Sequence, residues 1–281
     1  MNNIILSAFS DEYAKPFTEQ LEGMSGFGIS YIELRFIDGR NVSELSVEEA
    51  KEIKKMLDEK GIRVSAIGSP LGKIKLDGDM KSHMETAERV FEIANVMGTK
   101  FIRVFSFYAP EGKDIHSCRD DVIAALSDML ALARKYGVVL CHENEAKIYG
   151  DTPEYCRDLL DAFGGELKCV FDMGNFVLEG VDPYPQGYEL LKKDIAYFHI
   201  KDSLFAGAIV PPGKGDAKIK EILDAHKAYA KSDFFISLEP HLQTFDGLNK
   251  LKGRDFDNPY KYEDMKTAFI DAVNKIRSII G

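Results

Sequence analysis

The chain lacks several features that would assign it to a class at once. None of its apolar runs approaches the roughly 20 residues of a membrane-spanning helix, and MNNIILSAFSDE at the start has no secretory-signal pattern. Lys and Arg number 36 against 46 Asp and Glu, which argues against partners gripped through phosphates, such as nucleic acid or an anionic membrane. The four cysteines form no CxxC pair, so reduced thiols are expected. The sequence therefore predicts a cytoplasmic globular protein.

Eight short apolar runs recur at intervals of roughly 30 residues, with amphipathic helical segments between them. Runs this short and this rich in Val, Ile and Phe are typical of parallel strands buried on both faces. Ser46 and Glu49 predict a capping box ahead of one helix, Thr152-Pro153 opens another, and Gly137 marks a helix end. The runs are Ile4–Ala8, Tyr31–Leu34, Val64–Ile67, Phe101–Phe105, Val138–His142, Cys169–Asp172, Ala196–Ile200 and Phe234–Leu238.

This repeat predicts a single α/β domain over residues 1–281, a closed (β/α)8 TIM barrel. An open doubly wound sheet is the competitor, but its dinucleotide version carries GxGxxG after the first strand, and here Ser7-Ala8-Phe9-Ser10 follows it. Long loops are expected near residues 202–215 and 241–262. Both would lie on the carboxyl-terminal face, where barrel enzymes place their chemistry.

Charged side chains stand at the carboxyl ends of four consecutive predicted strands: Glu143, Asp172, His199 and Glu239. In a closed barrel these ends converge, and like charges brought together are costly without a cation among them. One divalent metal ion is the simplest answer. The oxygen-rich set favours Mn²⁺ or Mg²⁺, and the imidazole also admits Co²⁺ or Zn²⁺. His199 would then need an acceptor for its other ring nitrogen.

Other residues carry more modest expectations. Glu33 and Arg35 are expected to pair with each other, and His226 is expected at the surface. Phe9 and Phe107 follow strands and are candidates for stacking on a sugar. His241 shares a strand face with Glu239 and is a candidate pocket residue. Backbone N–H groups of residues 213–215 are a candidate phosphate cradle.

The motifs at these strand ends resemble those of the xylose-isomerase-like sugar phosphate isomerase/epimerase superfamily. The resemblance runs from the first strand to the eighth, and its most specific part is H-x-K-D followed by G-x-G-D. In that family the positions matching Glu143, Asp172, His199 and Glu239 bind one divalent metal. The matching segments are Ser7-Ala8-Phe9, Ile32-Glu33-Leu34-Arg35, His142-Glu143-Asn144-Glu145, Phe171-Asp172-Met173-Gly174-Asn175, His199-Ile200-Lys201-Asp202, Gly213-Lys214-Gly215-Asp216 and Leu238-Glu239-Pro240.

The chain also departs from that family. Family epimerases often have a histidine where Asn175 stands, and an arginine shortly after the position of His199, where this chain has none. Lys201 is predicted to replace that arginine as a donor to substrate oxygens, as a point charge and not as a fork. Asn175 and Glu145 complete the predicted substrate-binding set.

The resemblance implies a metal-dependent ketose isomerase or epimerase, favouring Mn²⁺, in which Glu143 and Glu239 remove and return a proton through an enediolate. An inosose-type polyol dehydratase with the same ligands is the main alternative. An abasic-site endonuclease is disfavoured because such enzymes use three zinc ions and many histidines, against 6 His and a net charge of −10 here. A non-catalytic sugar-binding barrel is a third alternative. The expected partner is a small sugar, with no nucleic acid or membrane, and homo-oligomerisation is left open.

Overall fold

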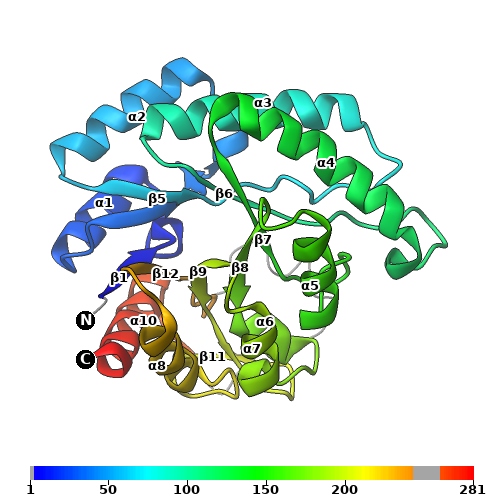
Figure 1. Ribbon diagram of the computed structural model, residues 1–281. Helices are drawn as coiled ribbons and strands as arrows, with labels where there is room; N and C mark the ends of the chain where they lie inside the picture. Colours follow the sequence, from blue (N-terminus) through cyan, green and yellow to red (C-terminus); the bar gives the residue numbers. More distant parts are fainter. Residues whose placement is uncertain (1–2, 243–259) are drawn as a thin grey trace.

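A computed structural model describes residues 3–242 and 260–281. Eight strands close into a barrel in the order β1-β12-β9-β8-β7-β6-β5-β2, with helices around it (Figure 1). The predicted (β/α)8 barrel is confirmed, and every strand overlaps the apolar run that predicted it. The barrel strands are β1 Ile4–Ala8, β2 Tyr31–Leu34, β5 Arg63–Ile67, β6 Phe101–Val104, β7 Val139–Glu143, β8 Lys168–Asp172, β9 Ile195–Ile200 and β12 Phe234–Leu238.

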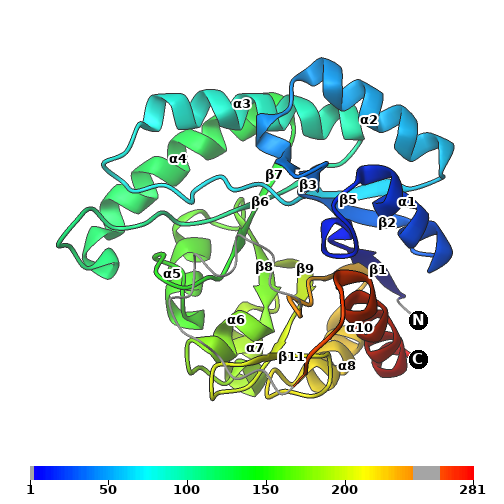
Figure 2. The same ribbon diagram turned by 180° about the vertical axis from the view of Figure 1, so that it is seen from behind.

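The helices form the outer layer, and both views show them surrounding the strands (Figure 2). The capping box of Ser46 and Glu49 precedes α2, Pro153 is the first residue of α5, and Gly137 ends α4 at a φ of 67°. The local signals thus fix these helix ends as predicted. The helices are α1 Phe17–Gly26, α2 Val47–Glu59, α3 Met80–Met97, α4 Arg119–Tyr136, α5 Pro153–Ala162, α6 Met173–Leu178, α7 Tyr188–Leu191, α8 Ile219–Tyr229 and α10 Met265–Ile280.

Strand alternation separates the barrel interior from the layer beneath the helices. Residues such as Phe171, Phe198 and Ile236 join the large apolar core, and a small separate cluster contains Cys141 and Tyr197. Successive side chains of a strand point to opposite faces. The side chains two positions beyond Cys141 and Tyr197, Glu143 and His199, therefore project toward the barrel axis.

The barrel closes between its first and last strands. β1 pairs with β12 in parallel, from Ile4 opposite Phe234 to Ala8 opposite Leu238. The loop predicted near 202–215 contains a short antiparallel hairpin, β10 Asp202–Ser203 with β11 Ile209–Val210. Most of the loop predicted at 241–262 lies outside the described residues.

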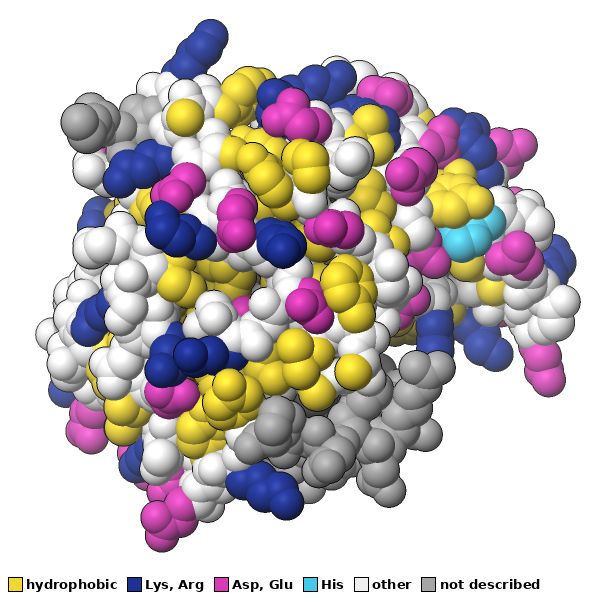
Figure 3. All heavy atoms as spheres, turned by 90° about the horizontal axis from the view of Figure 1, so that it is seen from below, with side chains coloured by type: hydrophobic (Ala, Val, Ile, Leu, Met, Phe, Trp, Pro, Cys, Tyr) yellow, Lys and Arg dark blue, Asp and Glu magenta, His cyan; other side chains and the backbone are white. Residues whose placement is uncertain are grey.

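The described surface and helices bear on the expected partners. On the face shown in Figure 3, acidic and basic side chains are interspersed among hydrophobic ones. In the described part of the chain, no helix combines the length and the apolarity needed to cross a bilayer. The four cysteines are buried and free.

Candidate active site and metal centre

The four predicted metal ligands lie together. Glu143, Asp172, His199 and Glu239 are all buried, and each offers one ligand atom within 4.8 Å of the others. Glu143 is the last residue of β7, and Asp172 is the last residue of β8. His199 is the last but one of β9, and Glu239 follows β12 directly. Asp172 is the register partner of His199, which is in turn the partner of Ser237, two residues before Glu239. Neighbouring parallel strands in this register place the four side chains at one mouth of the barrel.

Carboxylates hold both nitrogens of the His199 ring. Nδ1 lies 3.0 Å from Oε1 of Glu143 and 3.4 Å from Oε2 of Glu239. Nε2 lies 3.0 Å from Oε2 of Glu33, whose other oxygen accepts a 2.9 Å hydrogen bond from the Tyr197 hydroxyl. Burial alone would lower the pKa of His199, but Glu33, Glu143 and Glu239 together raise it well above its ordinary value. Glu33 is thus the second acceptor that His199 was predicted to need.

The expected pairing of Glu33 with Arg35 is wrong. The carboxylate of Glu33 lies inside the barrel, beside His199. The Arg35 guanidinium instead contacts Asp11 at 2.8 Å, Glu12 at 3.1 Å and Oε1 of Glu239 at 2.8 Å. Its carbon also lies 4.2 Å from the centre of the Phe9 ring. Glu33 is unavailable to Arg35 because His199 and Tyr197 already hold its two oxygens.

Arg103 is a site residue that the sequence analysis missed. Its Nη1 lies 3.3 Å from Oε2 of Glu143 and 3.6 Å from Oε1 of Glu239. It also donates to the backbone oxygens of Gly68 and Ser69 at 3.2 and 3.4 Å. The available signal was a single charged residue within an otherwise apolar strand, β6.

Lys201 is buried within the cluster, and its predicted contact with substrate oxygens stays a prediction. Its Nζ donates to Oδ2 of Asp172 at 2.7 Å, to Oε2 of Glu239 at 3.0 Å and to Oδ1 of Asn175 at 3.1 Å. Asn175 in turn donates to the backbone oxygen of Asn144 at 2.9 Å. Two of the four candidate metal ligands therefore share an ammonium group.

The two glutamates proposed for proton transfer are held as carboxylates. Burial would raise the pKa of Glu143, but His199 and Arg103 outweigh it and bring that pKa to about 2. The pKa of Glu239 is well below its usual range because Lys201 and the two histidines His241 and His199 outweigh burial. Burial raises the pKa of Asp172 to about 6, against the opposing charge of Lys201.

The residues at the mouth fit a divalent cation. Oxygen donors with one imidazole are a set that Mn²⁺, Mg²⁺ and Zn²⁺ all accept. Oε2 of Glu143 is a buried carboxylate oxygen without a hydrogen bond, although the Arg103 guanidinium lies near it. A carboxylate oxygen in this state is suited to a metal bond, because burial without a partner is costly.

A second group, Glu12, Glu239 and His241, also brings possible ligand atoms together. Nε2 of His241 lies 3.1 Å from Oε1 of Glu12, and the same oxygen is 3.1 Å from Arg35. The His241 backbone N–H donates to the other Glu12 oxygen at 2.7 Å. A guanidinium already serves as the cation here, and the group ties the end of β12 to the turn after β1.

The remaining predicted substrate residues differ in exposure. Phe9 and Phe107 are fully buried, with Phe9 edge-on to His199 at 5.1 Å and Phe107 at 6.3 Å from the His83 ring. Glu145 is half-buried, and its Oε2 accepts from Nζ of Lys73 at 3.3 Å. Contact of these residues with a substrate stays a prediction.

Two loops beside the mouth are joined through their backbones. Phe105 N–H donates to the Leu71 oxygen at 2.8 Å, and Phe107 N–H donates to the Gly72 oxygen at 3.0 Å. Gly72 has a φ of 87°, and a Cβ there would lie 2.0 Å from the Phe105 oxygen. The loops after β5 and β6 thus form one wall, which we call the β5–β6 wall (residues 68–76 and 105–108).

The candidate phosphate cradle is already filled. Oδ2 of Asp202 accepts from the backbone N–H groups of Gly213, Lys214 and Gly215 at 2.7, 3.0 and 2.9 Å. Its Oδ1 accepts from Ala217 at 3.2 Å. A carboxylate of this chain therefore occupies the candidate phosphate cradle.

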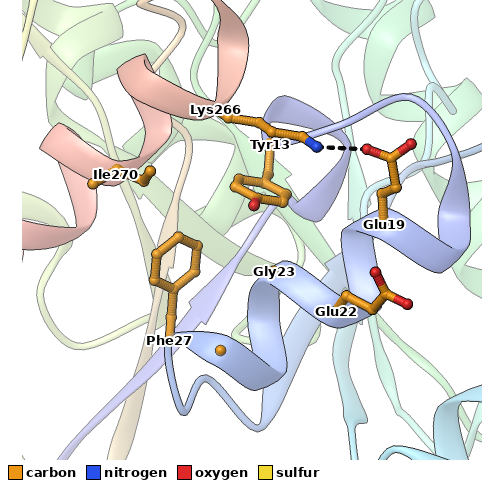
Figure 4. A pocket seen from close by; sticks show the side chains of 8 residues that line it. Tyr13, Glu19, Glu22, Gly23, Phe27, Lys266 and Ile270 are labelled. Carbon is orange, nitrogen blue, oxygen red and sulfur yellow. Dashed lines mark hydrogen bonds and ion pairs between the residues drawn. The ribbon is translucent and has the colours of Figure 1, made fainter.

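A surface pocket of about 460 Å³ lies outside the barrel, between α1 and α10 (Figure 4). Tyr13 and Phe27 line it, and an ion pair of 2.6 Å joins Lys266 to Glu19 across its rim. None of its lining residues belongs to the acidic cluster. The chemistry is therefore expected at the barrel mouth, where the charged groups gather.

Comparison with known proteins agrees with this architecture. A family model described as xylose isomerase-like TIM barrel matches residues 23–255. No curated protein matches the chain significantly. Among solved structures, a D-psicose 3-epimerase from Clostridium cellulolyticum H10, solved with D-tagatose, has a TM-score of 0.72 at 14% identity, covering 98% of this chain and 99% of that one.

Two further structures have similar scores. The probable 3-DHS dehydratase AsbF from Bacillus anthracis has a TM-score of 0.69 at 21% identity, covering 85% of this chain and 92% of that chain. A xylose isomerase-like TIM barrel protein from Mycobacterium smegmatis, in complex with magnesium, has a TM-score of 0.70 at 16% identity, covering 99% and 95%. At these identities the structural likeness speaks to the fold alone.

Proposed function

Since the chain belongs to the xylose isomerase-like TIM-barrel family, we propose that it is a divalent-metal-dependent isomerase or epimerase of a sugar or sugar derivative. The observation that carries the proposal is the buried convergence of Glu143, Asp172, His199 and Glu239. These four residues would hold the metal ion. The bound ion would supply Lewis-acid stabilisation of the negative charge that develops on substrate oxygens.

The protein side chains would carry the proton. Glu143 is the proposed base, because it can bind the ion by one carboxylate oxygen and accept a proton with the other. It would remove the proton from the carbon next to the substrate carbonyl, which leaves an enediolate. Glu239 lies on a different strand of the same mouth. After taking up a proton from solvent, it would deliver that proton to the opposite face or to the adjacent carbon, and Glu143 would release its own proton to solvent. Arg35 and Arg103 orient Glu239 through its Oε1.

Loss of water from a cyclic polyol is the second candidate. It needs the same base together with a proton donor for the departing hydroxyl. Lys201 Nζ lies 3.0 Å from Glu239 and is a cationic donor in this position. Identification of the product separates the two candidates, since an epimer keeps the substrate mass and a dehydration product loses one water.

The direct test is turnover of a ketose panel with added Mn²⁺ or Mg²⁺, in D₂O, after treatment with a chelator. We expect conversion together with deuterium incorporation at the reacting carbon. A cyclic polyol ketone in the same panel covers the dehydration candidate. The absence of exchange and of conversion across the whole panel would remove the proposal.

Replacement of the base gives a sharper prediction. Glu143→Gln should lower exchange and conversion by at least about 100-fold, because an amide cannot accept the proton. Circular dichroism should be unchanged. Glu154→Gln, an equal charge change at an exposed position of α5, is the matched control and should keep full activity. Normal activity in Glu143→Gln would contradict the assigned role.

A further inference from the structure

The ammonium group of Lys201 is placed where a bound cation would be placed. Its side chain is 3% exposed, and its three hydrogen-bond partners are Asp172, Asn175 and Glu239. An ammonium carries three donors, so all of its donors are used within the cluster. Two of the three acceptors are candidate metal ligands.

Lys201 and a metal ion would compete for the same oxygens. Oε2 of Glu239 lies 3.0 Å from Lys201 Nζ and 3.4 Å from His199 Nδ1, so it faces both the ammonium and a candidate ligand atom. Metal–oxygen bonds are about 2.0–2.2 Å long. An ion bound to that oxygen would therefore lie within about 5 Å of Nζ, in a buried site where like charges repel strongly.

We propose that Lys201 is a built-in counter-ion, which occupies the cation position of the site until a divalent ion displaces it, and which thereby sets the metal affinity. The inference rests on the proposed metal site and adds a regulator to it. Asn175 fits the displaced state, because its neutral Oδ1 can keep one ammonium donor while Asp172 and Glu239 turn to the ion. The liberated donors then face the mouth.

A purely structural lysine would behave differently. If Lys201 only cross-linked β9 to β8 and β12, its removal would loosen the ligands and weaken metal binding. A counter-ion opposes the metal, so its removal strengthens binding. The direction of the change in affinity therefore distinguishes the two roles.

The test is Mn²⁺ titration of the chelator-treated wild type and of Lys201→Met, which keeps length and removes charge. We expect Lys201→Met to bind Mn²⁺ roughly tenfold tighter or more, since one like charge near the ion is removed. Lys168→Met removes the same charge at the other end of β8, where Lys168 lies 3.9 Å from Asp194. That control should bind Mn²⁺ as the wild type does.

The outcomes separate the inference from the proposed function. Wild-type binding with equal or weaker binding by Lys201→Met overturns the counter-ion role and leaves the metal site standing. No Mn²⁺ binding by any of the three proteins overturns both. If Lys201→Met does not fold, Lys201→Arg decides: its forked guanidinium should hold Asp172 and Glu239 more firmly and weaken Mn²⁺ binding. Equal or tighter binding by that variant overturns the role.

A crystal structure with Mn²⁺ gives an independent readout. We expect Nζ to have left hydrogen-bonding distance of Asp172 or of Glu239, or of both, while the ion occupies the four-residue site. An ion bound there with the present contacts of Lys201 intact would overturn the inference.

Discussion

Single residues at the barrel mouth act through their partners, and His199 shows this most directly. Glu33 fixes the ring from β2, on the far side of the barrel from β9, and Tyr197 fixes Glu33 in turn. A carboxylate behind a metal-binding imidazole selects its tautomer and increases its basicity. Glu33 is therefore a positioning residue for the proposed metal site.

Glu33→Gln should weaken Mn²⁺ binding by roughly 10–100-fold, because an amide cannot supply the same charge behind the His199 ring. Isothermal titration measures this change. Tyr197→Phe removes one hydrogen bond to the carboxylate but keeps its charge, so a smaller loss is expected. Equal affinities in wild type and Glu33→Gln would show that Glu33 does not position the ring.

The sequence predicted which side chains meet where the direction of the strands alone brings them together. It did not predict the partners of long side chains, which depend on how far and in which direction those side chains extend. The convergence of Asp172 and His199 follows from parallel strands that end at one rim. The partners of Arg35 do not follow from the sequence, because a long side chain leaving a strand end can reach several loops. Arg103 lies within β6, and its approach to Glu143 and Glu239 likewise depends on the reach of a long side chain.

The loop after β9 is organised around one buried carboxylate. One carboxylate, that of Asp202, receives the backbone N–H groups of residues 213–215 and 217. Gly215 must lack a side chain here, since a Cβ would lie 2.2 Å from Oδ1 of Asp202. The G-x-G sequence that suggested a phosphate cradle thus forms a turn that wraps around the Asp202 carboxylate.

Asp202→Ala should destabilise the protein by about 3 kcal/mol, because several buried N–H groups would lose their acceptor. Asp202→Asn keeps one acceptor oxygen and should cost less. Urea unfolding measures both free energies. Asp216→Ala, which removes the acceptor of Phe205 N–H, is the control and should cost about 1 kcal/mol or less. Equal losses in Asp202→Ala and Asp216→Ala would contradict this account of the loop.

In the packing of the whole molecule, His226 corrects a further expectation. It was expected at the surface, but it is buried, with its Nδ1 3.2 Å from the Tyr188 hydroxyl and its ring against Phe198 and Phe234. The spacing of Ile219, Ile222, Leu223 and His226 on α8 was the available signal, since these positions share one helix face.

This histidine makes stability depend on pH. Burial lowers the pKa of His226 to about 4, against about 6.5 in an unfolded chain. The unfolded chain therefore binds the proton first, so stability is full above pH 6.5 and falls as the pH drops toward 4. The slope from one proton is at most about 1.4 kcal/mol per pH unit.

His226→Gln should flatten that dependence. Urea unfolding at pH 7, 6 and 5 measures it in both proteins, and the free energy of unfolding should fall less steeply in the variant. Only the slopes are compared, so any constant cost of the substitution cancels. Parallel slopes would show that His226 is not the titrating group.

The barrel as a whole was predictable because its repeat is strong. Each strand is a short apolar run, several strands follow a glycine that ends the preceding helix, and the period leaves room for one helix. The hairpin of β10 and β11 was not predicted, because two-residue strands within a loop have no periodicity. Local sequence thus determines the order of strands and helices here, while the conformation of the loops depends on contacts between distant residues.

The β5–β6 wall has a consequence for changing what the mouth accepts. Its two loops share a backbone ladder through Gly72 and Phe107, so neither can be lengthened alone without breaking the other's hydrogen bonds. If the mouth binds a sugar as proposed, its substrate range would be altered by transplanting both segments together as one module.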